Sequence, residues 1–421
     1  MSSFRGEDSL GHWLDRHHLD VIRTMVTTLD GSGLGSHIHR HTFVKSLPDG
    51  CHIRELAQST EHGVADKNWP ELLLRPDLTT LIQDRHNPNL GHCIAEYASE
   101  DGTPISFCPR TTLRKIVEQL EAQHYQAQVA FELAFCLFDS PYDQIRGDSY
   151  QNLAPVSGLT KTHSIRRAYH IRDFMGEVTE RMGYLGVEFE SWNNLANGQV
   201  QLNLLPGDPL VSADCVIRTK EVLYEVAVDY SLAATFMTTP TSDYNGAIHI
   251  RHTLTSDQTP PEHARSFWIG GLVQELNATM SFLRPTANDY RRGPTVTSTW
   301  GTDTNCAIRS LNDDDINIEH RVSASDINPY LALSVILASG ISGLVNQTKT
   351  PPIQQPLILP ATLTDAVENL EQDSYLSKII GRYTVAHWVA NRHKEAMEFQ
   401  QHTEDDDVIS RWELDRYFEI I

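Results

Sequence analysis

The sequence lacks the features that mark secreted and membrane-spanning proteins. Its six cysteines include no Cys-x-x-Cys pair, and no apolar run approaches the ~20 residues needed to cross a bilayer. The first residues show no basic-then-apolar leader pattern. These absences predict a cytoplasmic protein whose cysteines are reduced and serve as small buried side chains.

Positive charge is also scarce. The chain has 34 Lys and Arg against 55 Asp and Glu, which gives a formal net charge of −21. Binding to nucleic-acid backbones or to anionic membrane surfaces depends on surplus cations. We therefore expect neither nucleic acid nor membrane as a partner.

The residues that are present predict a globular chain with two unequal parts. Of 421 residues, 40% are apolar and 21% are charged, which is enough for a sizeable core. Residues 1–110 mix short β-like runs with turn signals, whereas residues 111–421 alternate strand-like segments with long helical patterns. This change predicts an α+β fold with a small N-terminal domain, 1–110, and a large domain, 111–421.

Within the larger part, residues 127–138 form an apolar run interrupted by one acid, Glu132. A strand of this composition is buried on both faces, so the carboxylate needs a partner or a metal. Helical spacing of apolar residues predicts helices over 111–123, 212–235, 266–283 and 329–345, with Thr111 or Thr112 capping the first.

The larger part also carries six motifs in a fixed order. They are Gly198-Gln199, Ala234 to Pro240, Asn245 to His249, Arg284 to Arg292, Ile318 to Arg321, and Asn328 to Leu333. Their order and rough spacing resemble the glutamine synthetase family, particularly its γ-glutamyl-amine ligase branches. The resemblance extends from about Arg110 to the C-terminus and is weak before it.

The resemblance implies a glutamine-synthetase-like fold, with a small β-grasp-like domain and a large catalytic domain. It also implies a ring of subunits that share active sites, and small-molecule substrates. Members of the family use ATP and two divalent ions to activate a carboxylate as an acyl phosphate, which an amine then attacks.

By the same resemblance, Glu132, His249 and Glu319 are the ligands of the ATP-side ion. Two carboxylates and one imidazole suit Mg²⁺ or Mn²⁺. The alternative is a polar network inherited from an active ancestor. The second ion of the family is held by three glutamates, and the matching positions are Ala134, Asn193 and Gln201. Without anionic ligands a divalent cation is not held, so we expect one metal instead of two.

Other departures leave the use of ATP open. Residues 293–298 contain no acid, so the family's catalytic flap glutamate has no counterpart. The nucleotide-side stretch carries Asp313, Asp314 and Asp315, which would repel a polyphosphate.

The cationic residues of the family's site are better kept. Arg309 and Arg321 match arginines that face the phosphate and the reacting carboxylate, and we expect them to be catalytic. Arg292 matches an arginine that holds the substrate's carboxylate, and Asn245 and Gly246 lie in a substrate-binding motif. For the three arginines, structural salt bridges are the competing interpretation.

Three functional hypotheses follow. The first, which family membership favours, is a ligase that joins the γ-carboxyl of glutamate or a similar acid to an organic amine. The second is an ATP-independent, single-metal enzyme acting on an amide or amino-acid-like compound. The third is a non-catalytic, ring-forming homologue.

Overall fold

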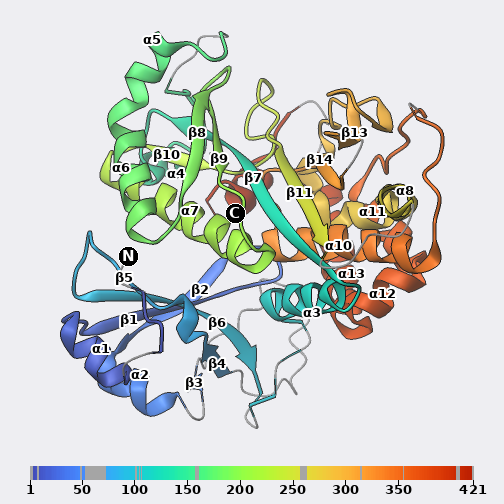
Figure 1. Cartoon of the computed structure of the whole chain (residues 1–421). Helices are drawn as coiled ribbons and strands as arrows, with labels where there is room; N and C mark the ends of the chain where they lie inside the picture. The colour runs from blue at the N-terminus through green and yellow to red at the C-terminus, as the bar shows by residue number, and fades with distance from the viewer. Residues whose placement is uncertain are drawn as a thin grey trace.

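In the computed structural model, two β-sheets from separate parts of the chain organise the molecule (Figure 1). The structure describes all residues except 1–2, 7–8, 48–49, 53–72, 100–101, 104, 106, 157–160, 257–262, 313–314, 354, 404–407 and 420–421. The combination of sheets and long helices confirms the predicted α+β class.

The smaller sheet belongs to the first hundred residues and is mixed. Its strand order is β2-β1-β6-β4-β3, with β5 also paired to β6, and β1 and β6 run parallel. The strands are β1 (Val21–Thr27), β2 (Gly33–His39), β3 (Cys51–His52), β4 (Leu73–Pro76), β5 (Ile82–Gln83) and β6 (Leu90–Ala98). They are joined by α1 (Leu10–Arg16), α2 (Arg40–Ser46) and the 3₁₀ turn η3 (Leu78–Thr80).

The larger sheet carries the predicted site residues. Its order is β12-β13-β14-β11-β7-β9-β8, with β10 paired to β7, and all pairs are antiparallel except β12 with β13. The strands are β7 (Tyr125–Phe138), β8 (Phe189–Asn194), β9 (Gln199–Leu204), β10 (Ala233–Thr235), β11 (Ile248–Ser256), β12 (Ser298–Gly301), β13 (Cys306–Ser310) and β14 (Asn317–Ser323).

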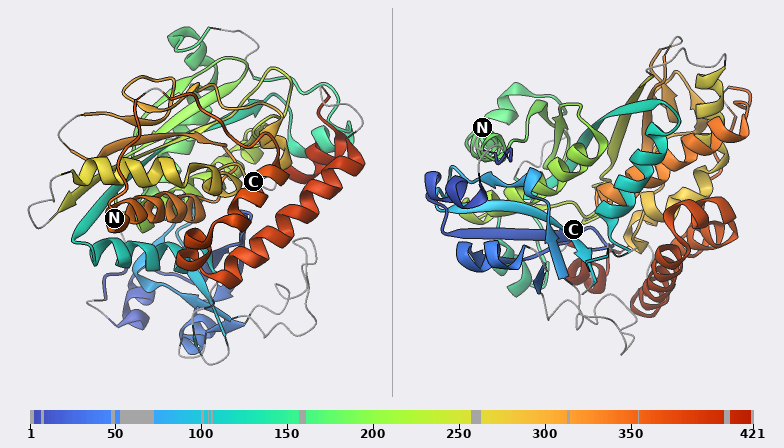
Figure 2. Two further views of the ribbon diagram at one scale, coloured as in Figure 1. Left: turned by 90° about the vertical axis from the view of Figure 1, so that its right-hand side faces the viewer. Right: turned by 60° about the horizontal axis from the view of Figure 1, so that its bottom comes forward.

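Helices cover one side of this sheet, and α13 lies on the outside of the molecule (Figure 2). They are α3 (Pro109–Glu121), α4 (Tyr142–Gly147), α5 (Ile165–Ala168), α6 (Arg172–Tyr184), α7 (Pro209–Asp229), α8 (Ala264–Gln274), α9 (Leu276–Leu283), α10 (Pro329–Asn346), α11 (Leu363–Gln372), α12 (Ser374–Ile380), α13 (Arg382–His402) and α14 (Arg411–Tyr417). Two 3₁₀ turns, η4 (Tyr169–Ile171) and η5 (Ala287–Tyr290), complete this part.

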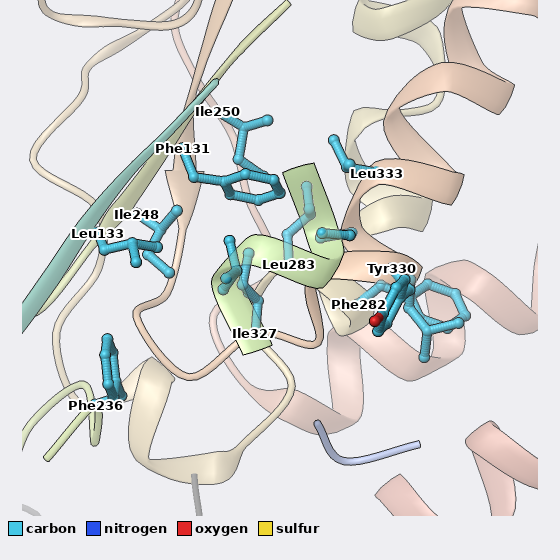
Figure 3. Close-up of a cluster of buried hydrophobic side chains, with 14 of the residues drawn as sticks. Phe131, Leu133, Phe236, Ile248, Ile250, Phe282, Leu283, Ile327, Tyr330 and Leu333 are labelled. Atoms are coloured by element: carbon cyan, nitrogen blue, oxygen red, sulfur yellow. The ribbon is translucent and has the colours of Figure 1, made fainter. Parts of the chain in front are cut away.

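Alternation along β7 and β11 separates the core from the site. Phe131 and Leu133 on β7, with Ile248 and Ile250 on β11, point to the helical side, where Figure 3 shows them beside residues such as Leu283. Because successive side chains of a strand face opposite ways, the residues between them face the other side of the sheet.

The two sheets have separate hydrophobic clusters, one within residues 13–108 and one within residues 82–418. The larger cluster includes Ile82 from the first hundred residues, and the predicted domains 1–110 and 111–421 stay a prediction. Arg110 connects the two parts, because it bonds Asp214 on α7 and also Glu96 on β6.

Several predicted helix limits were wrong. The first long helix begins at Pro109 after Cys108, not after a threonine cap. The helix predicted over 212–235 ends at Asp229, because Ser231 takes a left-handed conformation and the chain then enters β10. The helix predicted over 266–283 is divided at Glu275 into α8 and α9.

Most of the cysteines and one long apolar helix lie in the core. All six cysteines are free, and five of them are buried. One helix, α10, is long and apolar enough to span a membrane by length and composition, with a mean hydropathy of 1.5, but 83% of it is buried inside the molecule. Its apolar surface is therefore explained by packing in the core.

Candidate active site

The exposed side of the larger sheet is a continuous polar face. Strand alternation places Glu132 (β7), His249 (β11), Glu319 (β14), Arg309 (β13) and Gln201 (β9) on this side. His249 lies directly across from Glu132, and Arg309 lies directly across from Glu319. Residues distant in the sequence thus meet because their strands are neighbours.

Glu132, His249 and Glu319 form the predicted cluster of possible metal ligands. Each offers one ligand atom, and these atoms lie within 4.8 Å of one another. His249 Nδ1 is 3.3 Å from Glu132 Oε2 and 3.8 Å from Glu319 Oε1. In the part of the chain that the structure describes, this is the one group of three or more such residues that could hold a metal ion.

The predicted catalytic arginines lie beside this cluster. Arg309 Nη1 is 3.2 Å from Glu319 Oε2, and Arg321 Nη1 is 3.0 Å from the same oxygen. Arg309 also donates through Nε to the carbonyl of Thr302 at 3.0 Å. The buried Nε of Arg321 has no hydrogen-bond partner among the described residues. Glu319 therefore has two guanidinium groups around a single carboxylate.

The electrostatics of the cluster keep Glu132 ionised. The hydrogen bond with His249 lowers the pKa of Glu132, and the positive charges of Arg251 and Arg321 act in the same direction against the opposing effect of burial. An ionised carboxylate is the form that binds a cation.

A row of uncharged residues lies next to Glu132, at the three positions where the sequence resemblance implied a second set of metal-binding glutamates. Gln201 is directly across from Ala134 on one side and from Asn193 on the other, so the three predicted positions are neighbours on β7, β9 and β8. Gln201 Nε2 donates to Glu132 Oε2 at 3.2 Å and to Asn203 Oδ1 at 3.0 Å. An amide N–H group thus points at Glu132 from this side.

The predicted substrate-binding residues form a second group. Asn245 and Gly246 lie in the loop between β10 and β11, and Arg292 donates to the carbonyl of Ser242 in that loop. Asn245 Oδ1 is buried without a partner among the described atoms. At Gly246 a Cβ would lie 2.1 Å from Ser325 Oγ, so glycine is required there. No described contact joins Arg292 to the carboxylate cluster, and its role stays a prediction.

Sequence reasoning missed Arg251. It is exposed, lies on β11 two residues after His249, and is directly across from Glu319 on β14. No ion pair or hydrogen bond of its guanidinium is found among the described residues. Residues two apart in a strand face the same side, so the position of Arg251 two residues after His249 is the signal that could have found it. Of the acidic nucleotide-side stretch, Asp313 and Asp314 lie outside the described residues.

Two histidines near the cluster face the core instead. His252 and His320 are buried, and burial lowers their pKa values to about 3 and about 4. The indole Nε1 of Trp268 donates to His252 Nε2 at 2.9 Å. Both rings are therefore neutral parts of the core.

Comparison with known proteins gives a consistent result. The family model "Glutamine synthetase, catalytic domain" matches residues 106–417. A glutamate–isopropylamine ligase from Pseudomonas sp. is 26% identical, with 97% of both chains covered. A γ-glutamylethanolamide synthetase, GlnA4 of Streptomyces coelicolor, is also 26% identical, with 84% of this chain and 80% of the relative covered.

Solved structures show the same fold over nearly the whole chain. Apo GmaS without ligand superposes with a TM-score of 0.83 at 21% identity, covering 97% of this chain and 99% of the other. A GmaS/ADP complex also has a TM-score of 0.83, at 20% identity and with 97% and 98% covered.

Proposed function

Because the chain belongs to the glutamine synthetase family, we propose that it is a carboxylate–amine ligase. It joins the γ-carboxyl group of glutamate, or of a similar acid, to an organic amine. The observation that carries this proposal is the polar sheet face, where two carboxylates, an imidazole and two arginines meet in a chain of this family. Both named relatives are ligases or synthetases of glutamate-derived amides.

One divalent metal belongs to this proposal. Glu132, His249 and Glu319 are close enough to share an ion, and they supply the oxygen and imidazole donors that Mg²⁺ or Mn²⁺ accepts. Glu319 is almost buried, at 8% side-chain exposure; its Oε2 faces the two arginines, whereas its Oε1 faces His249 and is left for the ion. A bound divalent ion supplies positive charge that neutralises negative oxygens of the reactants.

The arginines orient the anionic reactant. Arg309 and Arg321 each use one terminal N–H group on Glu319, so other donors of the planar guanidinium remain for a substrate oxygen. The unpartnered Nε of Arg321 supports such a role. Positive groups fixed in place before the reaction stabilise the negative charge that develops on a carboxylate under attack.

Substrate binding is proposed for the loop before β11. The buried Oδ1 of Asn245 is an acceptor without a described partner, and buried acceptors in native proteins are normally satisfied. An N–H group of the substrate satisfies it. Gly246 keeps the loop against Ser325, and Arg292 is the proposed anchor for a second carboxylate.

Nucleotide use follows from the ligase proposal. Arg251 provides a positive charge on the site face, which favours binding of a polyphosphate. The neutral row at Ala134, Asn193 and Gln201 favours the second candidate, an enzyme with one metal and no ATP acting on an amide or amino-acid-like compound.

An ADP-release assay with glutamate and a panel of primary amines separates the hypotheses. The ligase releases ADP only when acid and amine are both present, and the amide product is detected by mass spectrometry. Turnover of an amide with metal but without nucleotide would establish the second hypothesis instead. If the protein is inactive and binds no metal, the hypothesis of a non-catalytic homologue remains.

We also propose that the chain forms a ring homo-oligomer in the cytoplasm. Family membership supports the ring, as do strongly exposed apolar side chains such as Ile165, at 88%, and Ile358, at 78%. The free cysteines suit a reducing compartment. Light scattering after size exclusion tests the oligomeric state, and a monomer at micromolar concentration would contradict it.

A further inference from the structure

A cavity lies away from the site face, between the two parts of the chain. Its volume is about 310 Å³, and it is bounded by helix α7, by the turn between β1 and β2, and by the segment around Phe236. The Phe236 ring lies 5.8 Å from that of Phe135, which is a core residue of β7. The cavity is therefore on the helical side of the larger sheet. Figure 1 shows α7 between the two sheets.

One face of α7 forms most of the wall. Ile217, Lys220, Glu221 and Tyr224 follow each other at helical spacing and all line the cavity. Lys220 is the cation of this wall. Among the described residues its ammonium donates one hydrogen bond, to the carbonyl of Ile327 at 3.3 Å, and it lies 4.9 Å from the centre of the Phe236 ring.

Two carboxylates face the same space. Glu221 accepts from Arg23 at 2.6 Å, and Glu419 accepts from Arg146 at 2.8 Å; neither arginine lines the cavity. Glu419 Oε1 is buried without a hydrogen-bond partner among the described residues. An ammonium group placed there would satisfy it.

The rest of the wall is apolar or small. Ile217, Leu223 and Phe236 contribute hydrocarbon surface, and Gly33 contributes none. A Cβ at Gly33 would lie 2.8 Å from Glu221 Oε1 and 3.0 Å from Met25 Sδ. The missing side chain keeps Glu221 in its place at the cavity.

From this arrangement we infer that the cavity binds a small zwitterionic amino acid with an apolar side chain. Lys220 takes the carboxylate, Glu419 takes the ammonium group, and the side chain packs against Leu223 and Phe236. A simple amine would be repelled by Lys220, and a simple carboxylate would leave Glu419 Oε1 without a donor. A ligand that carries both charges pairs with Lys220 through its carboxylate and with Glu419 through its ammonium group.

The cavity is connected to the proposed active site by one short segment. Lys220 bonds Ile327, and two residues earlier the backbone N–H of Ser325 donates to Thr238 Oγ1 at 3.3 Å. Thr238 in turn accepts the N–H of Gly246 through its carbonyl at 2.7 Å. A ligand that holds Lys220 therefore acts on the segment that supports the substrate-binding loop.

Isothermal titration calorimetry of the full chain without nucleotide tests the inference. The probes are L-norvaline and its two halves, butylamine and pentanoate. L-Norvaline is expected to bind, and Lys220→Met and Glu419→Gln should each weaken it roughly tenfold, because each removes a charged hydrogen-bond partner. Glu225→Gln is the matched control, since Glu225 also pairs with Arg23 but does not line the cavity.

Absence of L-norvaline binding would overturn the inference, and so would binding that neither cavity variant weakens. If butylamine or pentanoate alone binds as strongly as L-norvaline, and both variants weaken that binding, the inference that the ligand must carry both charges would be overturned. Circular dichroism checks that each variant is folded. Because no turnover is measured, failure of the ligase proposal would leave this result unchanged.

Discussion

Glu132 is the side chain on which the proposed site depends most. It meets His249 across one strand pair and the amide of Gln201 across another. One oxygen thus faces an imidazole and an amide N–H, and its pKa is held below the ordinary value mainly by the histidine. The Glu132 carboxylate is ionised before any ligand arrives, which favours a cation as that ligand.

Arg251 leads to the first prediction. Replacing it with alanine should weaken ATP binding about tenfold, because it removes a cation that has no competing described partner. Arg251→Lys should lose less ATP affinity, since the positive charge remains and only the planar guanidinium group is lost. The dissociation constant for ATP, measured by calorimetry, is the test.

Arg166→Ala is the control for this change, because Arg166 is an exposed arginine on α5 with no described contact to the carboxylate cluster. An unchanged ATP affinity in Arg251→Ala would remove Arg251 from the proposed site.

Lys220 leads to a prediction about pH. Burial lowers its pKa from 10.5 to about 8, although Asp326 and Asp30 act in the opposite direction. Between these values the unfolded chain holds the extra proton, so the contribution of Lys220 to stability rises with pH across that window. Below pH 8 the full cost is present, on the order of 3 kcal/mol.

Lys220→Met removes this cost, so the variant should be more stable than the natural protein below pH 8. Its advantage should shrink toward pH 10.5, as urea unfolding at several pH values would show. Lys394→Met, at an exposed lysine of α13, should give no such trend. An advantage that is independent of pH would contradict the explanation.

At the scale of elements, we expect three adjacent strands to set the number of metal ions. Ala134, Asn193 and Gln201 are neighbours across β7, β8 and β9, so glutamates at all three positions would face one another. The triple variant Ala134→Glu, Asn193→Glu, Gln201→Glu should bind two Mn²⁺ per chain, whereas the natural chain should bind one. Elemental analysis after dialysis measures the stoichiometry.

Ala134→Gln is the control for this design, because it adds the bulk of a glutamate without its charge. A natural chain that binds two ions would refute the single-metal proposal, and a triple variant that still binds one would show that these positions do not form the second site.

The limits of helices are also decided at this scale. Apolar spacing predicted one helix over 212–235, but residues 233–235 pair with β7 instead. Short apolar runs suit a buried strand as well as a buried helix, so periodicity alone does not separate the two. The division at Glu275 was equally invisible, because apolar residues continue on both sides of it.

At the scale of the whole molecule, Arg110 holds the two sheets together. Its side chain is 4% exposed, and the guanidinium bonds Asp214 on α7 and Glu96 on β6. Arg110→Met should cost about 3–5 kcal/mol of unfolding free energy, because it removes one partner of a buried ion pair and leaves Asp214 without its two hydrogen bonds from the guanidinium. Urea denaturation measures the loss.

Arg114→Met is the matched control. Arg114 is 39% exposed and also pairs with Glu96, so its loss should cost less than about 1 kcal/mol. Equal effects of the two substitutions would show that burial is not what makes Arg110 important.

Much of the molecule could be read from local chemistry along the chain. The buried strand with Glu132, the core helix from Pro329 and the ordered motifs all depend on neighbouring residues, and local patterns record them. What local patterns do not contain is which strands become neighbours. The pairing of β11 with both β7 and β14 brought Arg251 to the site, and the packing of α7 between the sheets enclosed Lys220. Such contacts join residues far apart in the sequence, so they exist only once the chain has folded.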